Sequence, residues 1–374
     1  MAASFGGECL DLSYDATGEA LAVANSCTTL PVIYSRADGV SWSPDKDQPI
    51  SPDPATSGFD QRQHPQSISW APVEHGRGLA AGYADGTVVI WEPTSSFDNQ
   101  DKCYYTHPLY PCLCAKDATG QVGVVRFAPV AAGRLLATGA DDGVVRVYVS
   151  DGSGAPWKLR DEFSVRRDAE EKTTITTLAW APTTAEDAPL LAVATGCAAA
   201  AGATAAPSRA GGISLWSRHS AHRATGRVGV SDAGGAWFLA LDLLGSDSPT
   251  RTLAWGPRAG RNAHTLASAG GDGAADHRVA LWRIVSDGAP PPEMQGSEED
   301  RAAASRLLLV SRATGSSVSG SPLAFFIASH GVPIDQVEFT PSGALVTSAG
   351  PKFLTWRETT HVGGWVATGE ENAE

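Results

Sequence analysis

Four residues in the first third of the chain carry the side chains that zinc prefers, namely Cys103, His107, Cys112 and Cys114. Structural zinc sites normally place their cysteines in Cys-x(2–4)-Cys pairs, whereas one residue separates Cys112 from Cys114. On a strand these two cysteines would share one face as small core residues. We therefore expect no metal here and keep zinc as the weaker alternative.

A second group, Asp272, Asp276 and His277 in GGDGAADHR, suggests a cation-binding loop. Calcium loops place their oxygen ligands at a stricter spacing than this. The segment is therefore more typical of a solvated hairpin turn.

Motifs for covalent or phosphate chemistry are missing from the sequence. It contains no Gly-x-Ser-x-Gly and no Gly-x-x-x-x-Gly-Lys, and its nine histidines are scattered. Ser, His and Asp do not occur together in a recognisable motif. We expect a protein that is not an enzyme and needs no cofactor.

The charge balance argues against polyanionic partners. Lys plus Arg number 28 and Asp plus Glu number 41, so the net charge is 28 − 41 = −13. The densest basic spot, Arg160, Arg166 and Arg167, is neutralised by its acidic neighbours (Asp161, Glu162, Asp168, Glu170 and Glu171). We expect no direct binding of nucleic acid.

Neither a signal peptide nor a membrane-spanning segment is evident in the sequence. The opening residues lack a basic start and an apolar run, and no stretch approaches ~18 uninterrupted apolar residues. Six cysteines at irregular positions are too few for a disulfide scaffold. We expect an intracellular protein without direct membrane insertion.

The elements that would position any site come from an internal repeat. Each copy opens with alternating apolar residues that end in an aromatic residue, continues through a strand of small residues, and ends in a second aromatic residue. The first aromatics are Tyr14, Trp70, Phe127, Trp180, Trp255 and Phe339, and the second are Tyr34, Trp91, Tyr148, Trp216, Trp282 and Trp356. Asp85-Gly86 and Asp142-Gly143 lie between two such strands, where a tight hairpin needs a positive φ.

This pattern predicts an all-β fold, a six-bladed WD-repeat-like β-propeller built of four-stranded blades. We expect one domain over 1–374, with blades at about 7–58, 59–118, 119–171, 172–248, 249–331 and 332–374. Long loop insertions are expected at 197–212 and 286–305. The Gly-His and Trp-Asp dipeptides of regular repeats are missing, so their buried Asp-His-Ser-Trp network should be mostly absent and apolar packing should hold the blades.

Two segments resemble a known family. VRFAPVAAGRLLATGADDGVVRVY (125–148) and WGPRAGRNAHTLASAG (255–270) are similar to WD-repeat scaffold nucleoporins of the Seh-one type, close homologues of the vesicle-coat protein Sec-thirteen. In the second segment, Pro257, Gly260, Arg261 and His264 carry the likeness. It extends over blades two to five, about 59–284, and is weak in blade one.

The resemblance implies an open propeller and a scaffold role in the Y-shaped complex of the nuclear pore, at the nuclear envelope. A helical-solenoid nucleoporin would complete the ring with an inserted β-blade, and other subunits of the Y-shaped complex would be further partners. The family also serves in an amino-acid-sensing coat-like complex upstream of the TOR kinase, which would add a lysosomal or vacuolar location.

An open ring leaves strand edges that an added strand can pair with. The predicted partner-binding residues lie on the facing edges of blades one and six: Leu10, Leu12, Tyr14, Phe353, Leu354 and Trp356. Two other functions remain open. One is a Sec-thirteen-like subunit of a vesicle outer coat, and the other is a peptide-recognition WD-repeat adaptor.

Overall fold

The computed structural model describes most of the strand-forming sequence. Its described residues are 7–36, 41–45, 50, 63–93, 109–116, 118–152, 154–165, 173–184, 188–197, 211–218, 237–246, 250–258, 263–270, 278–285, 319–327, 334–350, 352–359 and 365–372. The predicted insertion at 286–305 lies outside them, as do residues 198–210 of the predicted insertion at 197–212, whose ends belong to strands. Also outside the described residues are Cys103, His107, Arg166, Arg167, Asp272, Asp276 and His277.

The described strands form six four-stranded sheets, the blades. Blade one contains β1 (Cys9–Tyr14), β2 (Ala20–Asn25), β3 (Val32–Ser35) and β4 (Ser43–Pro44). Blade two contains β5 (Pro65–Trp70), β6 (Leu79–Tyr83), β7 (Thr87–Pro93) and β8 (Leu109–Lys116). Blade three contains β9 (Val122–Phe127), β10 (Leu135–Ala140), β11 (Val144–Val149) and β12 (Lys158–Ser164).

The second half of the chain repeats this plan. Blade four contains β13 (Thr173–Trp180), β14 (Leu190–Cys197), β15 (Gly211–Arg218) and β16 (Trp237–Ser246). Blade five contains β17 (Thr250–Trp255), β18 (Ala263–Gly270), β19 (Arg278–Val285) and β20 (Ser319–Ile327). Blade six contains β21 (Gln336–Phe339), β22 (Leu345–Ala349), β23 (Lys352–Glu358) and β24 (Trp365–Asn372).

Every blade is an antiparallel meander in which consecutive strands pair. We call the first strand of each blade its inner strand: β1, β5, β9, β13, β17 and β21. Each inner strand ends at one of the six predicted first aromatics, and the second aromatics lie on the third strands. The prediction of an all-β, six-bladed propeller is confirmed. The open ring, the blade bounds and the single domain stay predictions.

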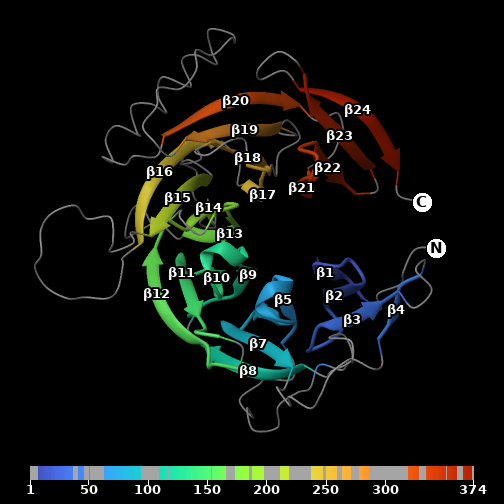
Figure 1. The fold of residues 1–374 in the computed structure, drawn as a ribbon, viewed down its shortest axis with the longest axis vertical. Helices are drawn as coiled ribbons and strands as arrows, with labels where there is room; N and C mark the ends of the chain where they lie inside the picture. Colours follow the sequence, from blue (N-terminus) through green and yellow to red (C-terminus); the bar gives the residue numbers. More distant parts are fainter. Residues whose placement is uncertain are drawn as a thin grey trace, which may run out of the picture. The chain divides into compact units, whose positions relative to one another are not determined.

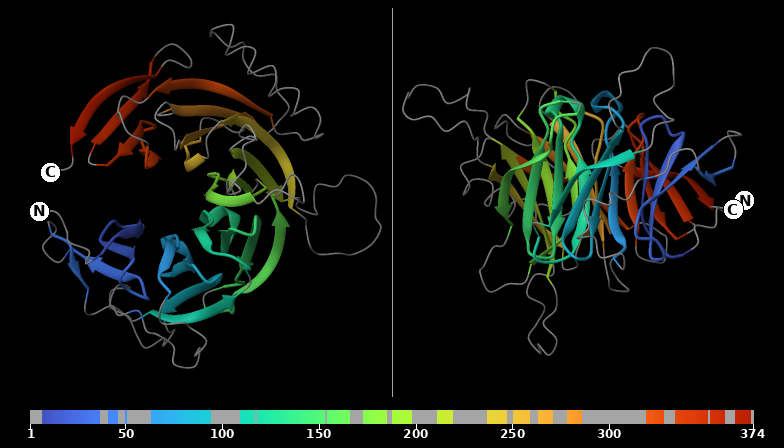
Figure 2. Two further views of the ribbon diagram at one scale, coloured as in Figure 1. Left: turned by 180° about the vertical axis from the view of Figure 1, so that it is seen from behind. Right: turned by 90° about the horizontal axis from the view of Figure 1, so that it is seen from below.

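The chain divides into two compact units, Met1–Glu170 and Glu171–Glu374. The first unit holds blades one to three and the second holds blades four to six (Figure 1). In the right-hand view of Figure 2, the strands of the first unit run in roughly the same direction. No helix among the described residues is long and apolar enough to cross a membrane.

Apolar residues between neighbouring sheets form the core of each unit. In the first unit, Ala22 and Ile33 of blade one pack with Ile68 and Trp91 of blade two in one buried cluster. In the second unit, Leu215 of blade four and Trp282 of blade five share another. Small residues on the second strands allow neighbouring sheets to approach closely.

Part of the Asp-His-Ser-Trp network of regular repeats is present in blades five and six. The indole N–H of Trp282 donates to Ser268 Oγ at 3.2 Å, and the indole N–H of Trp356 donates to Thr347 Oγ1 at 3.0 Å. In both blades a third-strand tryptophan thus bonds a second-strand hydroxyl. These bonds form because a buried indole N–H needs an acceptor. They are only a part of the network, and the expectation that it is mostly absent stays a prediction.

Candidate functional site

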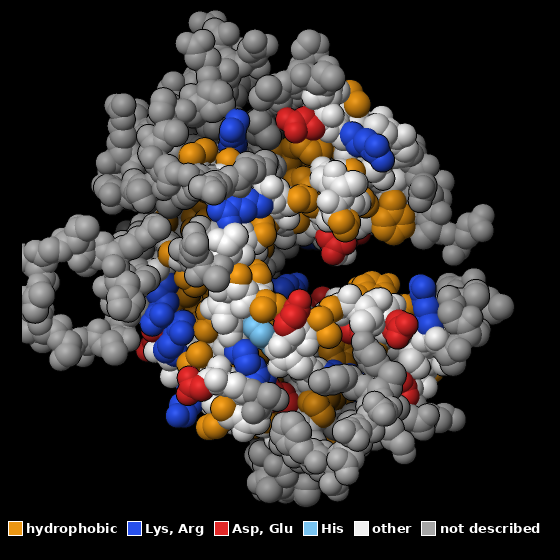
Figure 3. Space-filling model, viewed as in Figure 1, with side chains coloured by type: hydrophobic (Ala, Val, Ile, Leu, Met, Phe, Trp, Pro, Cys, Tyr) orange, Lys and Arg blue, Asp and Glu red, His pale blue; other side chains and the backbone are white. Residues whose placement is uncertain are grey.

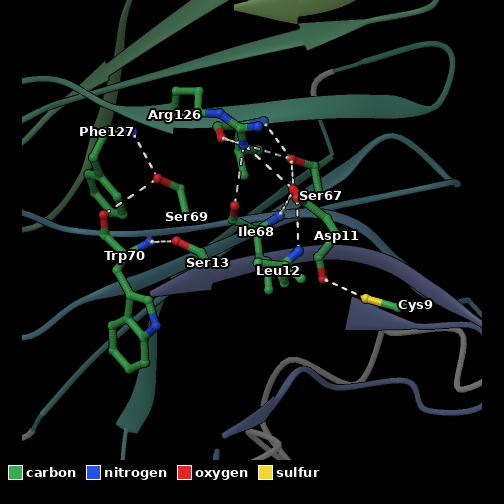
Figure 4. A network of polar contacts seen from close by, with 11 residues as sticks. Cys9, Asp11, Leu12, Ser13, Ser67, Ile68, Ser69, Trp70, Arg126 and Phe127 are labelled. Atoms are coloured by element: carbon green, nitrogen blue, oxygen red, sulfur yellow. Dashed lines mark hydrogen bonds and ion pairs between the residues drawn. The ribbon is translucent and has the colours of Figure 1, made fainter. Parts of the chain in front are cut away.

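The inner strands of blades one to three are joined by side chains that accept backbone hydrogen bonds (Figure 4). Asp11 Oδ2 on β1 accepts from the Ile68 backbone N–H at 2.9 Å. Ser13 Oγ, two residues further along β1, accepts from the Trp70 backbone N–H at 3.2 Å. Blade one therefore binds the backbone of blade two through two side chains on one strand.

Blade two repeats the arrangement toward blade three. Ser67 Oγ accepts from the Val125 backbone N–H, and Ser69 Oγ accepts from the Phe127 backbone N–H, both at 3.2 Å. Ser67 also donates to Asp11 Oδ2 at 2.8 Å, so the two junctions share one residue.

These contacts follow one register rule. Each acceptor position is counted back from the aromatic that ends its inner strand. The residue three positions before that aromatic accepts from the backbone N–H of the next inner strand two positions before the next aromatic. The residue one position before the aromatic accepts from the backbone N–H of the next aromatic itself. Blade five keeps the first contact toward blade six, because Thr252 Oγ1 accepts from the Val337 backbone N–H at 3.3 Å. At the junction of blades four and five, Thr176 instead donates to the Thr250 carbonyl at 2.6 Å.

Asp11 has a second role at the start of this series. Its other oxygen, Oδ1, accepts the backbone N–H of Leu12 at 2.9 Å. Leu12 holds the register position that a preceding inner strand would bind. Arg126 balances the shared carboxylate, with Nη1 at 3.5 Å from Asp11 Oδ2 and 3.2 Å from Ser67 Oγ.

One face of blade one carries a continuous set of apolar side chains. Leu12 lies opposite Val23, which lies opposite Val32, and Tyr14, Leu21 and Tyr34 form the neighbouring row. Trp42 packs against Tyr14 with ring centroids 5.8 Å apart. We call this set the blade-one apolar face: Leu12, Tyr14, Leu21, Val23, Val32, Tyr34 and Trp42. Figure 3 shows hydrophobic side chains at the surface over blade one.

The structure separates the predicted partner-binding residues into two groups. Leu12 is 41% exposed, Tyr14 52% and Phe353 37%. Leu10 packs against the core shared with blade two, and Leu354 and Trp356 are buried in the core shared with blade five. Only the first group can contact a partner without unfolding a blade, so the proposals below use Leu12, Tyr14 and Phe353.

Blade six presents polar groups beside Phe353. Gln336 and Glu338 on β21 are both exposed, and they occupy the two acceptor positions of the register rule. Among the described residues, neither side chain has a hydrogen-bond partner. Desolvation by the neighbouring protein raises the pKa of the Glu338 carboxyl even though the residue remains open to solvent.

The described part of the chain contains no group of three or more residues able to hold a metal ion. Cys112 and Cys114 lie on the same face of β8, as expected for a strand, but that face is exposed, so the expectation that they are core residues was wrong. Cys112 Sγ rests against the backbone and donates to the Ile90 carbonyl at 3.3 Å. Desolvation raises the pKa of this thiol to about 12. A thiol that stays protonated is a poor metal ligand and a poor nucleophile.

Sequence reasoning missed the acceptor residues on the inner strands. The signal was present in the segments that revealed the repeat. Before the first aromatics, LDLSYD, QSISWAP and RTLAWGP place Asp, Ser or Thr at the third position back. These polar residues interrupt strands that otherwise face a core, and such residues are normally retained because they make a hydrogen bond.

The comparisons with known proteins converge on one kind of protein. The chain is 24% identical over 265 residues to nucleoporin SEH1-B of Xenopus laevis, a match that covers 69% of this chain and 62% of that protein. It is 26% identical over 189 residues to nucleoporin SEH1 of Osmerus mordax, covering 49% of this chain and 46% of the relative. The SEH1 of Saccharomyces cerevisiae is 28% identical over 161 residues, or 41% of each chain. The predicted resemblance to Seh-one nucleoporins is confirmed.

Solved structures agree on the fold alone. The structure described as "Structure of Dos1 propeller" has a TM-score of 0.51 and 10% identity, covering 93% of this chain and 68% of that one. The "Crystal Structure of Mitotic Checkpoint Complex" contains a chain with a TM-score of 0.53 and 12% identity, covering 96% of this chain and 76% of that one. No protein-family model matches the chain.

Proposed function

We propose that this chain is a non-catalytic scaffold subunit of the nuclear pore, in its Y-shaped complex. It binds a helical-solenoid nucleoporin that completes the propeller with an inserted β-blade. The observation that carries the proposal is the similarity to nucleoporin SEH1 over 69% of this chain, together with six propeller blades. The matched region is 62% of that relative's length.

The blade-one apolar face supports a binding role. Tyr14 and Leu12 are among the few large apolar side chains that are exposed in the described structure. Arg36 lies over the Trp42 ring, 4.5 Å from its centroid, and adds a cation beside the apolar surface. Exposed aromatics with an arginine nearby are typical of residues that dominate binding energy at interfaces.

The test is co-expression of the chain with candidate solenoid nucleoporins of its source organism, followed by size-exclusion chromatography. We expect a stable 1:1 complex with one solenoid, and we expect the complex to be lost when the β-segment of that solenoid is deleted. A monomer that ignores every solenoid would contradict the proposal. Co-elution with a vesicle outer-coat partner instead would favour the Sec-thirteen-like function.

A substitution series locates the contact on blade one. Leu12→Asp should weaken binding of the solenoid about tenfold or more, because it places a charge in a desolvated apolar contact. Leu159→Asp on β12 is the matched control, since Leu159 is 42% exposed and Leu12 is 41% exposed. Equal affinities of the two variants, measured by calorimetry, would remove blade one from the interface.

The role in amino-acid sensing and the lysosomal or vacuolar location rest on the resemblance and stay predictions. The complex with the solenoid tests neither of them.

A further inference from the structure

The inner strand of blade six ends the series of acceptor side chains without a recipient in the described structure. At the junctions of blades one to three, residues three and one before the terminal aromatic bind backbone N–H groups of the next inner strand, and Thr252 does so at the junction of blades five and six. On β21 the terminal aromatic is Phe339, so the same positions hold Gln336 and Glu338. Both side chains end in a carbonyl or carboxylate oxygen that can accept such a bond.

The chain's own first strand is a poor recipient for these acceptors. The register position that Gln336 would bind is the backbone N–H of Leu12 on β1. Asp11 Oδ1 already occupies that N–H at 2.9 Å. On three other inner strands, the backbone N–H at this position donates to a side chain of the preceding blade. These donors belong to Ile68, Val125 and Val337.

We propose that Gln336 and Glu338 bind the backbone N–H groups of the inner strand of the blade that the partner inserts. This rests on the function proposed above and names the groups by which blade six recognises that strand. The occupant is an extended β-strand, because each acceptor of this register in the described junctions binds strand backbone. These two contacts do not select particular side chains of the partner, because they involve only its backbone N–H groups.

The chemistry of Glu338 fits this role. The carboxyl is partly desolvated before any partner binds, and its pKa is raised accordingly. A backbone N–H donated to it would replace the hydrogen bonds that it makes with water, and bonds to a charged acceptor are stronger than neutral ones. Phe353, which is 37% exposed, lies in the same cross-strand row as Gln336, because both pair with Ser348, and it supplies an apolar contact on that row.

The test uses the full chain and the solenoid nucleoporin that binds it, with the β-segment of the solenoid intact. Dissociation constants are measured by calorimetry for the wild type, Glu338→Gln, Glu338→Ala and Glu338→Lys. Glu358→Lys is the charge-matched control, because Glu358 is exposed at the end of β23 on the face that Leu354 and Trp356 occupy.

We expect Glu338→Gln to stay within about twofold of the wild type, because its amide oxygen still accepts. Glu338→Ala should weaken binding about three- to tenfold, the effect of losing one hydrogen bond. Glu338→Lys should weaken it further, because it sets a donor against a donor, and Glu358→Lys should bind normally. In amide exchange, the partner's strand N–H groups should exchange faster in the Glu338→Ala complex.

Two results would overturn the proposal while leaving the scaffold function intact. In the first, Glu338→Ala binds as tightly as the wild type. In the second, Glu338→Ala lowers the unfolding temperature of the isolated chain, which would show that the acceptor is used within the chain. If no solenoid binds the wild type, the proposed function and this inference both fail.

Discussion

Glu92 joins blades two and three through a buried polar contact. One of its carboxylate oxygens accepts from Arg134 Nη2 and, at 2.8 Å, from the indole N–H of Trp157. The Arg134 guanidinium also lies 5.3 Å from the Trp157 ring centroid. The side chains of Arg134 and Glu92 are only 11% and 12% exposed, so neither can replace its partner with water.

Removing this carboxylate should therefore be costly. We expect Glu92→Ala to lower the free energy of unfolding by about 3–5 kcal/mol, because a buried guanidinium loses its counter-charge. Glu92→Gln should cost less, since the amide still accepts. Glu162→Ala is the control: Glu162 is 63% exposed and 4.0 Å from Arg146, so it should change stability by less than about 1 kcal/mol. Chemical denaturation measures all three, and equal losses for Glu92→Ala and Glu162→Ala would refute the prediction.

Asp142 should make stability depend on pH. Burial raises the pKa of its carboxyl, but the Arg146 guanidinium and the N–H groups of Thr119 and Val144 outweigh this, so the pKa lies below its usual value. A carboxyl whose pKa is lower in the folded state stabilises the fold above its unfolded pKa, about 3.9, and loses that contribution as pH falls through the folded pKa.

The comparison of wild type with Asp142→Asn isolates this carboxyl. The stability difference between them should be largest near neutral pH and should narrow as pH falls below about 4. Unfolding free energies measured from pH 7 to pH 3 test this. A difference that stays constant over that range would show that the ion pair with Arg146 does not stabilise the fold.

At the scale of elements, tight turns let neighbouring blades approach. Gly86 has a φ of 90° between β6 and β7, and a Cβ placed there would lie 2.3 Å from the Ala118 carbonyl oxygen. Gly133 has the same φ of 90°, and nothing lies within 4 Å of its added Cβ. The two glycines therefore share a positive φ, but only Gly86 is crowded.

This pair separates backbone strain from collision. Gly133→Ala should cost about 1–3 kcal/mol, because φ 90° with ψ 178° is a backbone conformation essentially restricted to glycine. Gly86→Ala should cost about 1–3 kcal/mol more, because the backbone of the next segment must move. Thermal and chemical unfolding of both variants measure the gap. Equal losses would mean that the contact at Ala118 relaxes without cost.

The strands could be predicted from sequence because their ends are marked by aromatic residues, but the faces of the edge strands could not. A bulge between Cys9 and Asp11 shifts the alternation of β1. Leu10 consequently packs on the core with blade two while Leu12 is exposed. A shift of one residue reverses the face of every side chain on a strand, and nothing in the sequence marks this bulge.

On β23 the same ambiguity affects three neighbouring residues. Leu354 and Trp356 face the core with blade five, and Phe353, which directly precedes Leu354, faces the other way. All three are large and apolar, so hydrophobicity alone could not assign them. Cross-strand register settles the matter, since Phe353 lies opposite Ser348 while Leu354 lies opposite Thr347.

For the whole molecule, the net charge of −13 predicts the absence of nucleic-acid binding. In the face shown in Figure 3, basic and acidic side chains are interspersed over the first unit. We expect no shift in the mobility of DNA or RNA at 0.15 M salt, because a phosphate backbone needs concentrated positive charge. Retarded DNA whose binding weakens steeply with added salt would contradict this expectation.

The register of the inner strands gives the order of blades a polarity. Each acceptor points toward the following blade, and the first strand satisfies its own leading N–H through Asp11. The first strand of the series therefore has its leading N–H bonded within blade one, whereas β21 at the end of the series offers two acceptors that have no hydrogen-bond partner among the described residues. A strand placed after blade six would therefore meet backbone acceptors on β21, whereas its contact with blade one would rest on side chains such as Leu12 and Tyr14.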